Sequence, residues 1–149
     1  MRITFSSKIT HLLDQLKLNQ IQTEVFWNGI DISEEQRAEI FAQFGTDEYA
    51  EFFIASTTPK YQNQGLASEL YKRSLTFLSV LGYKVVKSIF TSPKSRHIAT
   101  KLGFVEISNP RIYYKDLKGF NGEFVFKDIS LTDECYACAM VKPLNYGYN

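Results

Sequence analysis

Apolar positions in the middle of the chain follow two different spacings. Residues 48–57 (EYAEFFIAST) and 83–90 (YKVVKSIF) are rich in β-branched and aromatic side chains, which is typical of strands. Between them, residues 66–81 carry apolar side chains at helical spacing, and Gly82 provides a C-terminal stop. The spacing predicts one apolar helix face, made of Leu66, Leu70, Ser74, Phe77, Leu78 and Leu81.

Capping signals predict two further helices. Residues 33–36 (SEEQ) match a capping box with acids in the first turn, and Gly45 marks the end of that helix. Residues 92–103 open with a serine–proline pair and close with leucine–glycine, as a short helix does. Nearer the start, residues 6–18 show roughly helical spacing, while residues 25–27 (VFW) fit either a short strand or a packed loop.

The last third of the chain is rich in strand-like segments. Residues 104–107 begin one strand, and residues 135–142 (CYACAMVK) form another. Residues 111–115 and 123–127 flank a loop with an Asn-Gly pair, which is a hairpin signal. The order of these elements predicts an α/β (α+β) fold, in which helices pack on a mixed sheet.

Composition and charge narrow the class of protein. With 149 residues, 44% of them apolar, the chain is long enough for one domain with a full core. A net charge of +1 argues against general nucleic-acid or anionic-membrane binding. No apolar run approaches the roughly 20 residues of a membrane span, and the opening MRIT is unlike a signal peptide. Two cysteines without a secretory signal predict a reducing, cytoplasmic setting.

We expect no metal site and no redox pair. Cys135 and Cys138 have CxxC spacing without a second pair, and residues three apart on a strand point to opposite faces. His11 and His97 have no neighbour at ligand spacing, so both are interpreted as structural.

The segment that carries chemistry is residues 62–67 (QNQGLA), which join the first predicted strand to the long helix. A strand that turns directly into a helix leaves the first helical N–H groups unpaired and pointing forward. Together with the positive end of the helix dipole, these groups suit a phosphate or pyrophosphate. Gly65 allows the backbone to approach a ligand closely, and the small Ala67 does not block it. The alternative is an ordinary strand-to-helix turn.

Residues 62–67 resemble the Gln/Arg-x-x-Gly-x-Gly/Ala signature of the GCN5-related N-acetyltransferases, and residues 101–104 (KLGF) resemble that family's second motif. A narrower similarity, to the arylalkylamine N-acetyltransferase-like branch of arthropods and nematodes, covers residues 41–144. The resemblance implies a mixed, mostly antiparallel sheet flanked by helices. It also implies acetyl transfer from acetyl-coenzyme A to a primary amine, a small arylalkylamine-like molecule.

The resemblance further assigns the contacts of the cofactor. In this family the signature's amides hold the pyrophosphate, and the pantetheine pairs with the main chain of the preceding strand. The resemblance therefore implies that the phosphates bind to the amides of Gln64, Gly65, Leu66 and Ala67, and that Gln62 and Asn63 complete the turn. It also implies that the pantetheine binds to the main chain of Ile54, Ala55, Ser56 and Thr57.

A general base is needed because the amine must lose a proton before it attacks the thioester. Glu51 lies eleven positions before Gln62 and resembles the general-base glutamate of the histone-acetylating members. By strand alternation it shares a face with Phe53, Ala55 and Thr57. The alternative is a solvated glutamate at a strand end.

The leaving thiolate needs a proton or a hydrogen bond, and Ser95 lies where the arylalkylamine branch carries a serine. The alternative is that Ser92 caps the helix and Ser95 is simply exposed, and for Thr91 we favour a structural role. Tyr113 and Tyr114 fit either an acceptor pocket or packing in the predicted hairpin.

The chain departs from the family before residue 48. Family members normally carry a first strand, one or two helices and two further strands there, whereas about fifty residues with mainly helical patterns are found here. We therefore divide one domain into a helical segment (1–47), an acetyl-coenzyme A-binding core (48–107) and a C-terminal hairpin and strand (108–149). The alternative function is a catalytically silent acyl-coenzyme A-binding or regulatory module. A second copy of the chain could complete the sheet edge in a homodimer.

Overall fold

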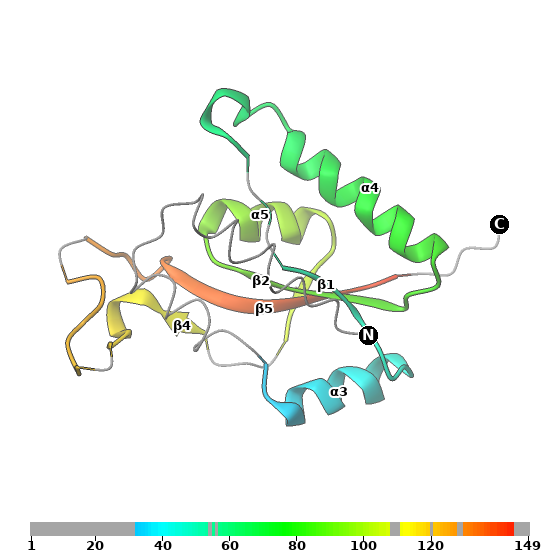
Figure 1. The fold of residues 1–149 in the computed structure, drawn as a ribbon, viewed down its shortest axis with the longest axis horizontal. Helices are drawn as coiled ribbons and strands as arrows, with labels where there is room; N and C mark the ends of the chain where they lie inside the picture. Colours follow the sequence, from blue (N-terminus) through cyan, green and yellow to red (C-terminus); the bar gives the residue numbers. More distant parts are fainter. Residues whose placement is uncertain are drawn as a thin grey trace.

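The sheet of this protein is covered by helices on both faces. The computed structural model describes residues 32–53, 55, 57–107, 111–119, 121–127 and 130–144. Figure 1 shows α4 (Leu66–Val80) and α5 (Pro93–Lys101) on one face of the sheet and α3 (Glu34–Phe44) on the other. The predictions for residues 6–18 and 25–27 lie outside the described residues.

The sheet is mixed and mostly antiparallel, as expected for the predicted fold class. Its strand order is β1 (Ala50–Phe52), β2 (Val85–Phe90), β5 (Tyr136–Pro143) and β3 (Val105–Glu106), and β4 (Ile112–Tyr113) also pairs with β5. Only the β1–β2 pair is parallel among the described strands. β5 is therefore the central strand, and β1 lies at one end of the described sheet.

The predicted capping box at Ser33 and the predicted N-cap at Ser92 are both confirmed. At the start of α3 the Gln36 amide donates to Ser33 Oγ at 3.3 Å, and the Ser33 amide donates to Gln36 Oε1 at 2.8 Å. α3 ends at Gly45, which has φ of 57° and whose carbonyl accepts from Lys84 Nζ at 2.6 Å. Ser92 caps α5 in the same way.

Alternation along β2 and β5 divides the core into two clusters. The cluster beneath α4 and α5 consists of Tyr71, Leu75, Val86, Phe90, Ala99, Phe104, Tyr136, Cys138, Met140 and Leu144. The cluster beneath α3 consists of Ile32, Ile40, Val85, Ala139 and Val141. Each helix layer is thus held by its own apolar surface of one sheet.

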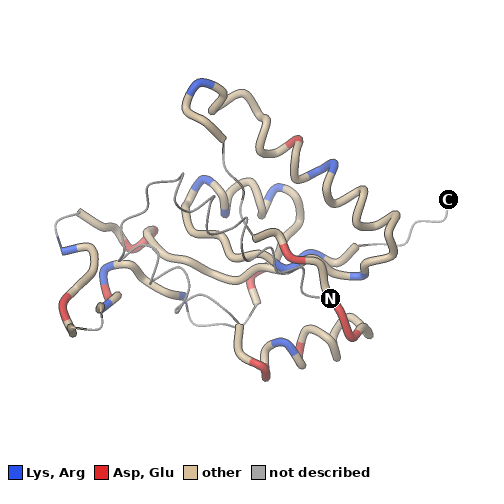
Figure 2. Tube along the Cα trace, viewed as in Figure 1, with Lys and Arg blue, Asp and Glu red and all other residues tan. Residues whose placement is uncertain are grey.

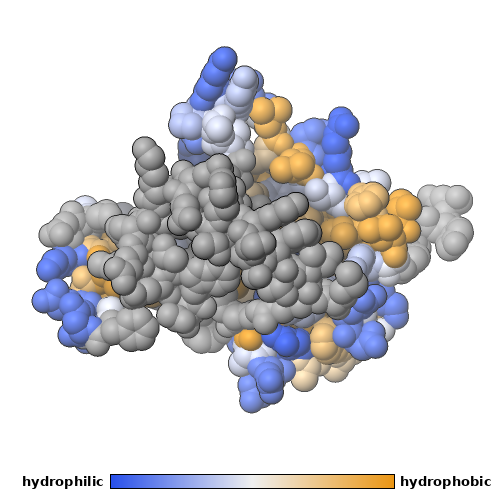
Figure 3. All heavy atoms as spheres, in the orientation of Figure 1, coloured by the Kyte–Doolittle hydropathy of each residue, from blue (hydrophilic) through white to orange (hydrophobic). Residues whose placement is uncertain are grey.

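The predicted apolar face of α4 is only partly right: Leu78 packs against the core, but the helix is rotated from the expected orientation. Tyr71 and Leu75 are the buried residues of this helix, and Tyr71 packs its ring against Phe52 at 5.2 Å and Phe90 at 6.0 Å. The large ring has more area to bury than a leucine, so the helix turns that side to the sheet. Four of the six predicted positions, Leu66, Leu70, Phe77 and Leu81, are exposed, and Figure 3 shows hydrophobic side chains on the surface in the region of α4.

The predicted second strand of the C-terminal hairpin, residues 123–127, is also wrong. The described residues form a tight turn, with one antiparallel bridge between Lys118 and Phe124. The Gly119 amide donates to the Glu123 carbonyl at 2.9 Å inside it. β4 cannot continue into a hairpin because it pairs with β5 and then enters a 3₁₀ turn, η2 (Tyr114–Asp116).

Candidate functional site

The parallel strands β1 and β2 part at their carboxyl ends. The recorded pairing runs from Ala50 opposite Val86 to Phe52 opposite Ser88, where β1 ends, whereas β2 continues to Phe90 against β5. The buried Ser88 hydroxyl donates to the Phe52 carbonyl at 2.7 Å at this last rung. Openings at the carboxyl ends of parallel strands are common ligand sites.

β1 is shorter than the predicted strand at 48–57, which affects the expected pantetheine contacts. Ile54 and Ser56 lie outside the described residues. Ala55 is exposed and Thr57 is half-buried. The Thr57 carbonyl accepts from Gln62 Nε2 at 3.0 Å, so this side chain braces the segment that leads to the turn.

The turn before α4 leaves a run of main-chain donors available. After η1 (Pro59–Tyr61), the Gln62 amide donates to the Pro59 carbonyl at 3.2 Å. The next bonded amide is that of Glu69, which donates to the Gly65 carbonyl at 3.0 Å. Within the described part of the chain, the amides of residues 63–68 have no acceptor and α4 has no side-chain cap. A helix start in this state suits an anion.

Backbone conformation explains why this turn has its sequence. Asn63 has φ of 60° and Gly65 has φ of 76°, and asparagine and glycine are the residues that tolerate this left-handed region. A Cβ on Gly65 would meet no protein atom within 4 Å, so the glycine faces open space. Gln64 Nε2 donates to the Lys60 carbonyl at 3.2 Å and ties the turn to η1.

Charges around the turn do not oppose an anion. The segment 62–67 itself has no charged side chain, and Lys60 precedes it. The acidic residue of the first helical turn, Glu69, is paired with Arg73 at 2.9 Å. Figure 2 shows acidic and basic residues along α4, and a basic residue at the tip of the segment that precedes this helix.

Glu51 lies one residue before the end of β1 and is ion-paired. Its Oε1 is 2.6 Å from Nζ of Lys87, directly opposite it in the parallel register. The Lys87 side chain is fully buried, whereas that of Glu51 is 29% exposed. The expected apolar surroundings of Glu51 are therefore replaced by an ion pair on the α3 face. Sequence reasoning missed Lys87, although a lysine in the middle of an apolar strand was the available signal.

Ser95 is part of the α5 cap. Its hydroxyl donates to the Ser92 carbonyl at 2.9 Å and accepts from the Ser92 amide at 3.2 Å. The Thr91 carbonyl accepts from the Tyr114 hydroxyl at 2.7 Å, and burial raises the pKa of this tyrosine. Tyr113 packs its ring against Tyr136 at 5.4 Å. These contacts agree with the packing alternative for both tyrosines.

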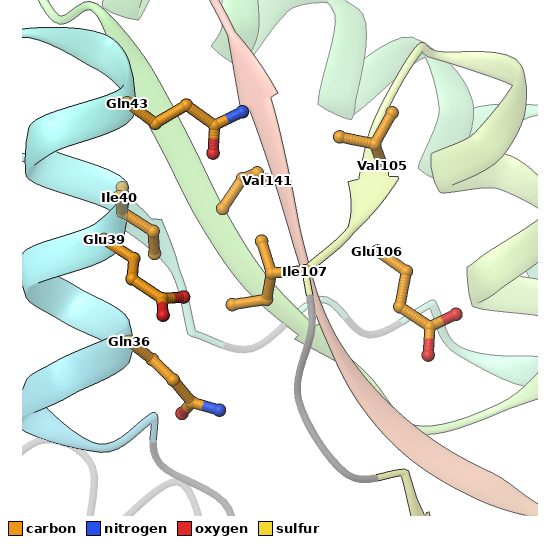
Figure 4. A pocket seen from close by; sticks show the side chains of 8 residues that line it. All are labelled: Gln36, Glu39, Ile40, Gln43, Val105, Glu106, Ile107 and Val141. Carbon is orange, nitrogen blue, oxygen red and sulfur yellow. The ribbon is translucent and has the colours of Figure 1, made fainter.

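A surface depression of about 160 Å³ lies elsewhere, between α3 and β3. Figure 4 shows four side chains of α3 facing those of β3 and β5 across it. It contains none of the predicted site residues. Among the described residues, no three His, Cys, Asp or Glu side chains could together hold a metal ion, and no helix is long and apolar enough to cross a membrane.

The two cysteines should differ in reactivity. Burial raises the pKa of the Cys138 thiol to about 11, whereas Cys135 is only half-buried. At pH 8 about one Cys138 thiol in a thousand is then ionised, and the thiolate is the reactive form. We expect iodoacetamide to label Cys135 in the native protein and both cysteines in urea, as read by mass spectrometry. Equal native labelling rates would contradict the burial of Cys138.

Comparison with solved structures identifies the fold. A mosquito arylalkylamine N-acetyltransferase like 5b matches 74% of this chain and 50% of its own, with 25% identity and a TM-score of 0.56. Arylalkylamine N-acetyltransferase 2 from Aedes aegypti matches 96% of this chain and 63% of its own, with 24% identity and a TM-score of 0.62. The chain has the fold of the GCN5-related N-acetyltransferases.

The same fold occurs in a Drosophila melanogaster polyamine N-acetyltransferase, with 18% identity, a TM-score of 0.55, and coverage of 91% of this chain and 55% of that one. This chain thus spans between half and two thirds of the length of these neighbours. No family model and no curated protein sequence matches it. The neighbours with this N-acetyltransferase fold are named for arylalkylamines and for polyamines.

Proposed function

We propose that this protein is an acetyl-coenzyme A-dependent N-acetyltransferase that acts on a small primary amine of the arylalkylamine type. The observation that carries the proposal is the run of main-chain donors at residues 63–68, in the segment that links β1 to α4. The names of the structural neighbours support the reaction class.

The turn before α4 has the chemistry that a diphosphate requires. Among the described residues its donors have no protein acceptor, no acidic side chain lies within the turn, and the space in front of Gly65 is open. The amides of Gln64 to Ala67 would hold the diphosphate, Gln62 and Asn63 would shape the turn, and the main chain of residues 54–57 would hold the pantetheine. When bound, acetyl-coenzyme A supplies the acetyl group as a thioester.

Glu51 is our proposed general base. α4 lies on one face of the sheet and Glu51 points to the other, one residue before the end of β1. A carboxylate offers about four acceptor positions, so one ammonium contact leaves others for a substrate proton. Ser95 could protonate the leaving thiolate only after its hydroxyl turns away from the Ser92 carbonyl.

The binding half of the proposal is tested by Gly65→Ala, with Gly45→Ala as the matched control. Both glycines have left-handed φ, 76° and 57°, and open space at the Cβ position. Each substitution should cost about 1–2 kcal/mol of stability from backbone strain. Only Gly65→Ala should weaken acetyl-coenzyme A binding, by about tenfold or more, because hydrogen bonds to a charged group are lost.

Isothermal titration measures this difference directly. Absence of acetyl-coenzyme A binding to the wild-type protein at millimolar concentration would overturn the proposal. Equal weakening in the two variants would show that strain, not the turn, affects binding.

A second candidate function is a coenzyme A-binding module without turnover. It is favoured by the chain's coverage of only 50–63% of the neighbours reported above. A thiol-release assay with tryptamine, dopamine and a polyamine separates the two candidates. Binding without amine-dependent thiol release would support the module.

A further inference from the structure

Lys87 is an unusual residue for the middle of a sheet. It lies on β2 between β1 and β5, and no part of it is exposed to solvent. Lysine is rarely buried to this extent unless it is paired, because its ammonium loses hydration. The pair is with Glu51 at 2.6 Å, and the Tyr49 ring lies 5.4 Å from the same ammonium.

The pair is asymmetric in its exposure. The Lys87 side chain is fully buried, whereas Glu51 keeps 29% of its side chain exposed. The ammonium therefore contacts Oε1 of the carboxylate from the buried side, while part of the Glu51 side chain reaches solvent. A buried ion pair is weak evidence for a role in stability, since apolar residues of similar volume often replace both partners without loss.

The pair lies close to the end of β1. Glu51 and Lys87 form the rung directly before the last recorded one, Phe52 opposite Ser88, and β2 continues beyond it. A carboxylate on a free side chain could adopt several rotamers, and a misplacement of about 1 Å can cost a hundredfold in rate. The buried ammonium restricts those rotamers near the carboxyl end of β1.

We propose that Lys87 is a positioning residue that aims the Glu51 carboxylate at the amine bound near the carboxyl end of β1. This inference rests on the function proposed above. In the step concerned, an alkylammonium gives one proton to the outward oxygen of Glu51 and becomes the neutral amine. Lys87 stays bound to the inward oxygen and does not touch the substrate.

The test compares Lys87→Met, Glu51→Gln and the double variant, with Lys84→Met as the matched control. Lys84 contacts the Gly45 carbonyl rather than Glu51, so its substitution should leave kcat unchanged. Lys87→Met should lower kcat by about tenfold to a hundredfold, with unchanged affinity for acetyl-coenzyme A in titration. The double variant should be no slower than Glu51→Gln, since Lys87 acts only through that carboxylate.

Each outcome is decisive. If Lys87→Met folds and keeps the wild-type kcat, or if its loss persists in the Glu51→Gln background, the positioning role is wrong while the transferase remains. If Lys87→Met does not fold, the double variant, which carries no buried charge at this pair, still gives the second comparison. If the wild type releases no thiol with any amine, the proposed function fails, and the positioning role fails with it.

Discussion

Glu51→Gln is expected to lower kcat by about 10²–10⁴-fold, the usual contribution of a positioned general base. The glutamine keeps an oxygen near Lys87 but cannot accept a proton from the amine. Thiol release at saturating acetyl-coenzyme A and amine measures the loss. Because the substitution removes the carboxylate charge paired with the buried Lys87, the rates should be divided by the folded fraction, counted by titration with acetyl-coenzyme A.

Glu48→Gln is the control for this variant. Glu48 is an exposed acid three positions earlier, for which the structure shows only main-chain hydrogen bonds, with the Thr46 side chain. Its substitution should change kcat less than twofold, as expected for a surface position. Near wild-type turnover in Glu51→Gln would remove Glu51 from the mechanism and direct attention to another acceptor.

Phe90→Ala should have the largest effect on stability. The Phe90 side chain is 2% exposed and its ring packs against Phe104 at 5.4 Å and Tyr71 at 6.0 Å. Truncating a buried phenylalanine leaves a cavity and lowers the free energy of unfolding by about 3–5 kcal/mol. Urea unfolding followed by circular dichroism measures the change.

Phe77→Ala is the matched variant for the same experiment. Phe77 is 62% exposed on α4, although the apolar spacing of that helix predicts it to be buried. Its truncation should alter the free energy of unfolding by about 0.5 kcal/mol or less. Similar losses for Phe77→Ala and Phe90→Ala would mean that α4 packs with the predicted face after all.

Local signals in the sequence predicted the parts of this fold that depend on near neighbours. The capping box at Ser33 and the left-handed glycine at Gly45 each involve atoms within a few residues, and both were confirmed. The turn at Gly65 was predicted for the same reason. The central strand β5 was recognised from a continuous apolar run, which is typical of a strand buried on both faces.

Predictions that depended on distant partners were less successful. The buried side of α4 is decided by Tyr71 meeting Phe52 and Phe90, which no spacing within the helix reveals. The contact between Glu51 and Lys87 depends on the register of two parallel strands joined by a long crossover. A pattern read along one strand could propose Glu51 but could not supply its partner.

The turn before α4 offers main-chain rather than side-chain donors, and this has a consequence for how such proteins diverge. Amide hydrogens are present in every residue except proline, so most of the six positions in QNQGLA can drift without removing a donor. Gly65 is the position whose residue type is most restricted, because its backbone has a left-handed φ. A turn that offers main-chain donors can therefore keep those donors while most of its side chains change.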